Sequence, residues 1–440
     1  MKHPSDSTIN RSILRLAVPS ILANITVPLV GIVDLAIAGH IGDATAMGAV
    51  ALGTMLFDLL YWNMGFLRAG TGGVTAQAFG RGDSRSAVDA FSQGIATALG
   101  VAVLIILLQW WFVDLAFLVI DCTQEVEEMA RQYFFVRIWA VPAALSLMVF
   151  RGWFIGMQNT VLPMIVDITV NLLNVAASII CAVPCGMGVR GIALGTVIAQ
   201  WSGMLLASVL MAVNFKEYLP LMNIRESVRW KYIKGMFGMN ANLIVRSLMM
   251  LVVYSGFTAL AAKYGDVELA VASLMMKLLL FYSYFTDGFA YAGEALVGRY
   301  IGSKEKDKLL RTIMLDFNWS IAIGIVSTVV YALAGRAMVS IFSDDPAVIA
   351  GCEPYLFWLV LMPVISCVAF TWDGIYIGAT ASRAMRNCMV FSAAAYVATY
   401  IALKGPLGIQ ALYLAYFVHL AVRTIYMTLM RRKYVLDRVD

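Results

Sequence analysis

The chain has 440 residues, 61% of them hydrophobic and only 13% charged, and its net charge is +5. With a mean hydropathy of +0.80, this composition excludes an ordinary soluble globular protein, whose share of charged residues is about twice as large. The chain is therefore predicted to be an all-α polytopic membrane protein.

Eight nearly charge-free apolar stretches are each close to the roughly 20 residues that cross a bilayer as a helix, and four further spans that hold a few internal charges, 16–39, 44–79, 133–154 and 275–297, bring the count to twelve. In chain order they are 16–39, 44–79, 90–113, 133–154, 168–189, 191–215, 247–262, 275–297, 318–335, 355–372, 387–403 and 405–422. The long, charged segment 214–234 follows the sixth stretch. It predicts two six-helix lobes, 1–213 and 235–440, joined by a cytoplasmic connector.

The first stretch contains an acid and a proline. Asp34 is the only charged side chain between Leu16 and His40. An ionised side chain in hydrocarbon costs a few kcal/mol or more, so Asp34 is the first candidate for a coupling-ion site. Pro19 removes a backbone hydrogen bond from the same helix, which predicts a hinge there. A titratable acid on a bendable helix favours transport.

The second stretch has a counterpart in the second half of the chain. In the first half Gly42-Asp43 precedes a long apolar helix that ends at Gly80, and in the second half Gly265-Asp266 precedes one that ends at Gly302. The glycines are 38 and 37 residues apart, respectively. Both copies run in the same direction, which predicts two pseudo-symmetric bundles related by an axis along the membrane normal, with a substrate cavity between them.

The fifth stretch carries a polar stripe. Asp167, Asn171, Asn174 and Ser178 follow an i, i+4, i+7, i+11 pattern and therefore share one helix face. We expect this face to line the cavity, although packing between helices explains Asn171 equally well. Asp167 lies about 16 Å from Ser178 along the helix axis, so the two cannot act together.

The second lobe has its own charges at membrane depth, Arg246, Asp287 and Glu294. They predict either an ion-pair network that holds this lobe together or a polar cavity wall. The position that matches Asp34 in the repeat is near Phe257, so the coupling acid is expected only in the first lobe. The 25 methionines suit an adaptable apolar pocket, but core filling is the favoured interpretation of any one of them.

The basic residues orient the spans. With the amino terminus in the cytoplasm, 22 of the 32 Lys and Arg residues fall in cytoplasmic segments and five in outside loops. This bias predicts that both termini are cytoplasmic, and it explains the net charge without a nucleic-acid partner. No catalytic, phosphate-loop or metal-binding motif occurs, so neither an enzyme nor a cofactor or metal site is expected.

Four segments resemble the multidrug and toxic compound extrusion (MATE) family. They are the first stretch with Pro19 and Val33–Gly42 (VDLAIAGHIG), then Thr75–Asp83 (TAQAFGRGD), Gly191–Gln200 (GIALGTVIAQ) and Asp287–Gly298 (DGFAYAGEALVG). The last resembles the DinF-like branch of the family. The resemblance covers nearly the whole chain.

The resemblance implies a twelve-helix secondary transporter of a bacterial or archaeal plasma membrane. Such a protein exports small, amphipathic organic compounds against inward ion flow, and it is expected to act as a monomer in the lipid bilayer. Pro19 matches the family's first-helix kink, Asp34 its essential carboxylate, Asn174 its fifth-helix asparagine and Thr196 its sixth-helix threonine. Ser178 stands where the family commonly has a second aspartate, which favours protons over sodium as the coupling ion.

Further cavity candidates come from the same patterns: Asn171, Asp167, Gln200, Arg246, Asp287 and Glu294. Three alternatives stay open. A sodium-coupled antiporter would use the same acid. A lipid or polysaccharide-precursor flippase would need several cavity cations for a diphosphate head group, and four are available: Arg68, Arg137, Arg246 and Lys277. A passive channel or structural membrane protein would not need an unpaired carboxylate on a kinked helix.

Overall fold

The structure, a computed structural model, describes residues 6–41, 44–120, 122–222, 230–342 and 346–439. Within these ranges every regular element is a helix, and twelve helical stretches are long and apolar enough to cross a membrane. Six of the twelve end at or before Asn214, and six begin at or after Gly238. The predicted all-α membrane fold is confirmed.

The chain divides into two compact units. Unit 1 comprises Met1–Ile21 and Phe237–Asp440, and unit 2 comprises Leu22–Met236. The first helix, α1 (Asp6–Ile41), therefore begins in unit 1 and ends in unit 2, whereas the sequence analysis assigned all of it to the first lobe. Its first turns are tied to unit 1 by a hydrogen bond of 2.9 Å from the Trp319 indole to Asn10. The crossover comes two residues after Pro19.

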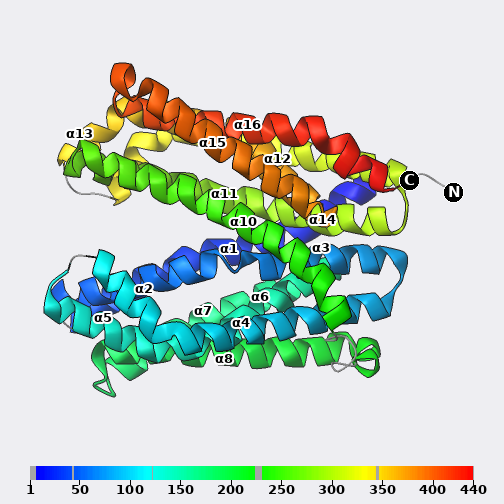
Figure 1. Ribbon diagram of the computed structural model, residues 1–440, viewed down its shortest axis with the longest axis horizontal. Helices are drawn as coiled ribbons and strands as arrows, with labels where there is room; N and C mark the ends of the chain where they lie inside the picture. Colours follow the sequence, from blue (N-terminus) through cyan, green and yellow to red (C-terminus); the bar gives the residue numbers. More distant parts are fainter. Residues whose placement is uncertain (1–5, 42–43, 121, 223–229, 343–345, 440) are drawn as a thin grey trace. The chain divides into compact units, whose positions relative to one another are not determined.

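Unit 2 contains the second part of α1 and the helices that follow it (Figure 1). They are α2 (Ala44–Trp62), α3 (Gly65–Arg81), α4 (Ser84–Val119), α5 (Gln124–Arg137), η1 (Ile138–Ala140), α6 (Val141–Gly156), α7 (Val161–Ala182), α8 (Gly188–Asn214) and η2 (Lys216–Leu221). The predicted uninterrupted stretch 44–79 breaks at Asn63, whose side-chain amide donates to the Leu59 carbonyl at 3.0 Å and so competes with the helical backbone. Of the expected connector 214–234, residues 223–229 lie outside the described ranges.

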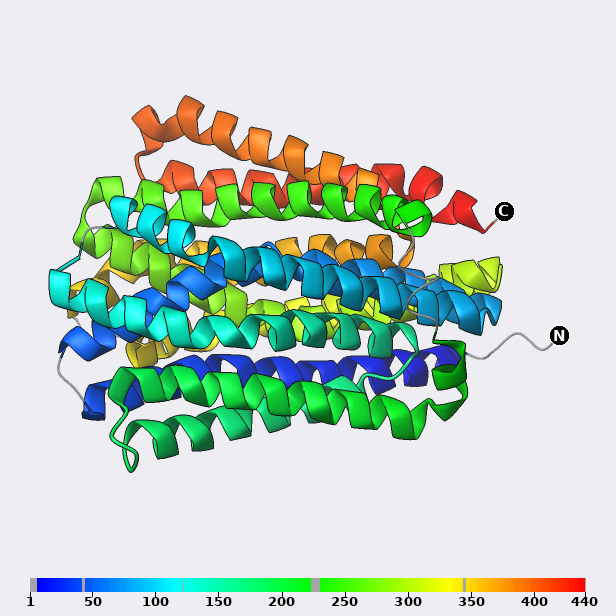
Figure 2. The same ribbon diagram turned by 60° about the horizontal axis from the view of Figure 1, so that its bottom comes forward.

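Unit 1 contains most of α10 (Trp230–Ala261) and all later helices. These are η3 (Ala262–Tyr264), α11 (Asp266–Gly302), α12 (Lys306–Phe342), α13 (Pro346–Cys352), η4 (Glu353–Tyr355), α14 (Leu356–Gly378), α15 (Ser382–Leu407), α16 (Gln410–Tyr434) and η5 (Leu436–Arg438). Figure 2 shows α15 and α16 side by side along their length. Both units place a short helix and a 3-10 turn before a long buried helix, α5–η1–α6 in unit 2 and α13–η4–α14 in unit 1.

Each of these buried helices ends in a glycine pair at i, i+4, Gly152–Gly156 in α6 and Gly374–Gly378 in α14. A Cβ added at Gly152 would lie 2.2 Å from the Arg68 carbonyl oxygen of α3, and one at Gly374 would lie 2.0 Å from the Ala290 carbonyl oxygen of α11. Only glycine lets these backbones approach so closely. The same device in both units supports the predicted internal repeat.

Outward-facing side chains on the long helices are apolar. On α4, Leu107 is 67% exposed, Trp111 77% and Leu118 81%. Their spacing places them on one face of the helix. Such a face would be costly in water and is suited to the hydrocarbon of a bilayer.

Candidate functional site

Asp34 lies in the part of α1 that belongs to unit 2, where it is only 5% exposed. Two contacts join α1 to α7 along this stretch. The Asn171 side-chain amide donates to the Thr26 hydroxyl at 2.6 Å, and further along both helices the Ser178 hydroxyl is close enough to the Asp34 carboxyl to act on its charge. Because both contacts advance in the same chain direction, α1 and α7 run parallel here.

The α7–α8 interface fixes the position of Ser178. The glycine pair Gly191–Gly195 in α8 packs against α7, and a Cβ added at Gly195 would lie 2.4 Å from both the backbone nitrogen and Oγ of Ser178. One turn earlier on α7, the Asn174 side-chain amide donates to the Thr196 hydroxyl of α8 at 3.0 Å. The structure thus brings Asn174 and Thr196 together, and Ser178, one turn further along α7, is the residue of this helix that acts on Asp34.

Two buried oxygens of this site lack a hydrogen-bond donor within the described ranges. They are Oδ1 of Asp34 and Oδ1 of Asn174. A buried acceptor left without a partner costs about 1–3 kcal/mol. Such a cost is recovered when a proton or a cation binds, so these two oxygens are candidates for holding an ion.

Arg137, on α5, is the cation that acts on Asp34. Its Nη1 donates to the Tyr133 hydroxyl at 2.7 Å and to the Thr54 hydroxyl at 3.3 Å, and its guanidinium lies 4.8 Å from the centre of the Phe57 ring. From this position its charge acts on Asp34 and on Asp58 of α2. The sequence analysis had considered Arg137 only as a head-group ligand of the flippase alternative.

The remaining predicted residues of unit 2 have other surroundings. Asp167 forms an ion pair of 2.5 Å with Arg151 of α6, so its charge is balanced away from Asp34. Gln200 is half-buried on α8, one turn after Thr196. Pro19 is half-buried within α1, just before the chain passes from unit 1 to unit 2.

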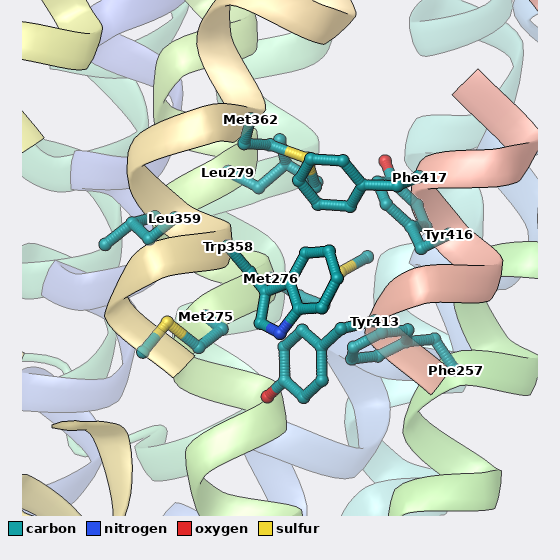
Figure 3. Close-up of a pocket in the computed structure, with 10 residues that line it drawn as sticks. All are labelled: Phe257, Met275, Met276, Leu279, Trp358, Leu359, Met362, Tyr413, Tyr416 and Phe417. Atoms are coloured by element: carbon teal, nitrogen blue, oxygen red, sulfur yellow. The ribbon is translucent and has the colours of Figure 1, made fainter. Parts of the chain in front are cut away.

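Unit 1 contains an apolar pocket with an empty volume of about 330 Å³ (Figure 3). Aromatic and methionine side chains from α10, α11, α14 and α16 form its walls, among them Phe257, Met276, Trp358 and Phe417. Phe257 lies near the position that the repeat aligned with Asp34. Where unit 2 has an acid, unit 1 therefore has a ring that faces a pocket.

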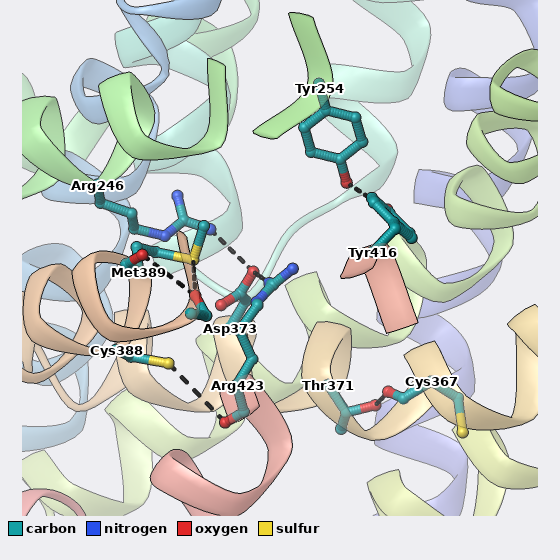
Figure 4. Close-up of polar contacts among 10 residues, drawn as sticks. Arg246, Tyr254, Cys367, Thr371, Asp373, Cys388, Met389, Tyr416 and Arg423 are labelled. Atoms are coloured by element: carbon teal, nitrogen blue, oxygen red, sulfur yellow. Dashed lines mark hydrogen bonds and ion pairs between the residues drawn. The ribbon is translucent and has the colours of Figure 1, made fainter. Parts of the chain in front are cut away.

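Arg246 of unit 1 forms an ion pair, as one of the two predicted alternatives required, but with a partner that the sequence did not indicate. Its Nη2 donates to Oδ2 of Asp373 on α14 at 2.8 Å, and the same oxygen accepts from Nη2 of Arg423 on α16 at 2.6 Å (Figure 4). The other two predicted charges lie on α11, where Asp287 is half-buried and Glu294 is fully buried. Asp373 and Arg423 had not been singled out.

The chemistry of these clusters is that of charge and hydrogen bonding. Among the residues that the structure describes, no group of three or more His, Cys, Asp or Glu side chains is arranged to hold a metal ion. The candidate sites are thus an acid next to an arginine in unit 2, and one acid shared by two arginines in unit 1.

The MatE family model matches residues 19–180 and 243–400 of the chain. The chain belongs to the MATE family of multidrug efflux transporters. It is 33% identical to DNA damage-inducible protein F of Escherichia coli K12 over 94% of this chain and 90% of that protein. It is 24% identical to a probable multidrug resistance protein NorM of Photorhabdus laumondii, over 87% of this chain and 84% of that one.

Solved structures of the family share the fold. The Vibrio cholerae MATE transporter VcmN in its bent form matches with a TM-score of 0.87 and 15% identity, covering 99% of both chains. A multidrug resistance MATE transporter in an outward-facing conformation matches with a TM-score of 0.88 and 17% identity, covering 100% of this chain and 99% of that one. The predicted family and twelve-helix fold are therefore both confirmed.

Proposed function

We propose that this MATE transporter is a secondary active exporter that exchanges organic compounds for protons by alternating access, with Asp34 as the acid that binds the proton. The observation that carries the proposal is the burial of Asp34, which is 5% exposed, with one oxygen unpartnered within the described ranges and with Ser178 and Arg137 as the groups that act on its charge. A carboxylate in such a place gains from protonation because its own burial penalises the charge.

Ser178 supports a proton as the coupling ion. Its hydroxyl donates to the Ile192 carbonyl at 3.3 Å and also lies within reach of Asp34. A hydroxyl has a single proton to donate. It can serve Ile192 and Asp34 together only when Asp34 is itself protonated and donates to Ser178. Ionised Asp34 competes with the Ile192 carbonyl for that proton. The strength of the Ser178–Ile192 hydrogen bond between α7 and α8 therefore depends on the charge of Asp34.

Arg137 supplies the second link. When Asp34 is ionised, the guanidinium of Arg137 attracts it, and when Asp34 is protonated this attraction is lost while that of Asp58 remains. Arg137 is held on α5 and α2 by Tyr133 and Thr54. Proton binding therefore loosens α1 from α5 and α2, which is a differential interaction of the kind that a conformational exchange requires.

When proton binding loosens α1 from α5 and α2, α1 is expected to change its bend near Pro19. The helix changes from unit 1 to unit 2 directly after this proline, so a change in its bend moves Asp34 relative to its own first turns. We place the protein as a single chain in the plasma membrane of a bacterium or archaeon, with both termini in the cytoplasm. It acts without enzymatic chemistry.

Sodium is the second candidate for the coupling ion. The unpartnered oxygens of Asp34 and Asn174 favour it, because carboxylate and amide oxygens are ligands for hard cations. Ser178 opposes it, because a hydroxyl stands where a second carboxylate would add negative charge for a sodium ion, whereas the charge of Arg137 disfavours a bound proton and a bound sodium ion alike. The proton is therefore preferred.

Transport in proteoliposomes separates the two ions. Export of a fluorescent organic substrate is measured under a pH gradient alone and under a sodium gradient alone, and the proposal predicts accumulation with the pH gradient only. The variant Ser178→Asp adds a second carboxylate and should make transport depend on sodium. Accumulation by the wild type under a sodium gradient alone would contradict proton coupling.

A further inference from the structure

The ion-pair cluster of unit 1 joins two arginines to one aspartate. Arg246 and Arg423 share the single oxygen Oδ2 of Asp373, so one carboxylate faces two guanidinium groups. A further acid nearby, Asp287, acts on Tyr254 of α10. The guanidinium of Arg423 is fully buried and lies 5.5 Å from the Phe370 ring centre.

The two arginines keep unused donors. Within the described part of the chain, Nε and Nη1 of Arg423 and Nε of Arg246 are buried without a hydrogen-bond acceptor. A guanidinium has five N–H donors in a planar fork that matches a carboxylate or a sulfonate. Among the described residues Oδ1 of Asp373 is also buried without a donor, so this carboxylate holds both arginines through Oδ2 alone. Buried donors without acceptors are unfavourable, and an incoming anion would supply acceptors to them.

The apolar pocket lies along the same helix face as Arg423. Tyr416 lines the pocket and stands seven residues before Arg423 on α16, which is two helical turns or about 10 Å along the axis. The Tyr416 hydroxyl donates to the Tyr254 hydroxyl at 3.2 Å, and both tyrosines are within reach of the charge of Arg423 (Figure 4). The pocket and the cluster thus meet at this tyrosine pair.

We propose that unit 1 binds an amphipathic organic anion. Its apolar part lies among the rings and methionines of the pocket, between Phe257 and Phe417 (Figure 3), and its carboxylate or sulfonate lies on Arg246 and Arg423. Asp373 holds the two arginines together when the site is empty. This site names the substrate class of the exporter and therefore rests on the proposed function.

The test is a binding measurement that needs no ion gradient. The purified transporter in phosphatidylcholine nanodiscs is titrated with 6-(dansylamino)hexanoic acid and, as a matched probe without the charge, with its methyl ester. A charge-assisted contact to a buried arginine predicts that the acid binds about tenfold more tightly than the ester. Equal affinities of the two probes for the wild type would overturn the proposal.

Variants of the cluster distinguish a binding role from a structural one. Arg423→Gln and Arg246→Gln should each remove the preference for the acid. Asp373→Asn removes the competing carboxylate, so it should strengthen binding of the acid and leave the affinity for the ester unchanged. Unchanged or weaker binding of the acid by this variant would overturn the proposal. The control is Arg131→Gln, which breaks an ion pair with Asp114 of unit 2 and should change neither affinity.

Two further arms complete the design. Thermal unfolding of each variant shows whether it is folded, so that only folded variants are compared. Repeating the titration in nanodiscs with phosphatidylglycerol distinguishes a membrane lipid, which would compete with the acid, from a soluble compound as the natural anion. The titration needs no ion gradient, so failure of the anion site appears as equal binding of the acid and the ester, whereas failure of proton coupling appears only in transport driven by a pH gradient.

Discussion

The two units share one helix arrangement but have side chains of opposite charge at a corresponding position. Arg151 directly precedes the glycine pair of α6 in unit 2, and Asp373 directly precedes that of α14 in unit 1. Two residues after each pair the backbone takes a positive φ, 63° at Gln158 and 52° at Thr380. The backbone has therefore kept its repeat, while the charge at the corresponding position is reversed.

The reversal gives the units different chemistry. In unit 2 Arg151 is paired with Asp167, which leaves Asp34 as the buried acid that faces Arg137. In unit 1 Asp373 is shared by two arginines, and a ring stands in place of Asp34. A duplicated frame can thus assign ion binding to one unit and, in our proposal, anionic substrate binding to the other.

The largest effect is expected from the glycine pairs that both units share. Gly152→Ala and Gly374→Ala place a Cβ against a backbone carbonyl that has no room to move, so each should lower stability by about 2–3 kcal/mol. Gly100→Ala, where a Cβ meets no atom within 4 Å, is the matched control and should be neutral or stabilising. Thermal unfolding in detergent measures the difference, and equal behaviour of all three variants would show that the repeated helix contacts are loose.

An intermediate effect is expected at the crossover of α1 between the units. Pro19→Ala restores a backbone hydrogen bond and should stiffen the helix, which slows turnover without altering the unfolding temperature. The control is Pro28→Ala, a proline of the same helix that lies entirely within unit 2. The initial transport rates of the two variants are compared. A wild-type rate for Pro19→Ala would show that this proline is not a hinge of the transport cycle.

The smallest effect is expected at the loops that begin α4 and α12. Asp83 caps α4, and hydrogen bonds from the Ser86 hydroxyl and backbone N–H hold the pKa of Asp83 below its usual 3.8. Its stabilisation is therefore present above pH 3.8 and lost as the pH falls through the lower folded value. Asp83→Ala should cost about 1 kcal/mol at neutral pH.

Thermal unfolding of Asp83→Ala and the wild type as a function of pH measures this effect. The two unfolding temperatures should converge in acid, and a difference that persists there would mean that Asp83 stabilises the loop by packing. Glu305 is its counterpart before α12 in unit 1: burial raises its pKa, but hydrogen bonds from Lys308 and Ser303 outweigh burial and lower it.

Much of the frame could be predicted from the sequence. Apolar stretches of membrane length and the position of the charged connector suffice for twelve helices in two groups, because the bilayer sets helix length. The polar stripe of α7 was also visible as a helix face. In the structure Asn171, Asn174 and Ser178 each contact or approach a different group of α1 or α8.

Charges at the ends of apolar stretches were misjudged. Asp373 and Arg423 directly follow charge-free stretches that end at Trp372 and Val422, and neither was singled out. The helices α14 and α16 continue beyond them and bury both side chains. A signal existed for Arg423, which is seven residues from Tyr416 on a face rich in aromatic residues.

The surroundings of Asp34 could not be foreseen. The sequence showed a buried acid, but its nearest cation, Arg137, comes from α5, and only the packing of α5 against α2 carries it there. The same holds for the crossover of α1, which depends on contacts of its first turns with α12. Partners distant in the chain are a property of the fold.

The central claim is that Asp34 is the acid that couples proton movement to export. Proteoliposomes loaded with a pH-sensitive dye report proton flux while substrate transport is followed, for the wild type, Asp34→Asn and the control Asp58→Asn, an exposed acid that also faces Arg137. The account predicts that Asp34→Asn loses both uphill export and substrate-dependent proton flux but still exchanges substrate for substrate, while Asp58→Asn keeps coupling. Full proton-driven export by Asp34→Asn would contradict it.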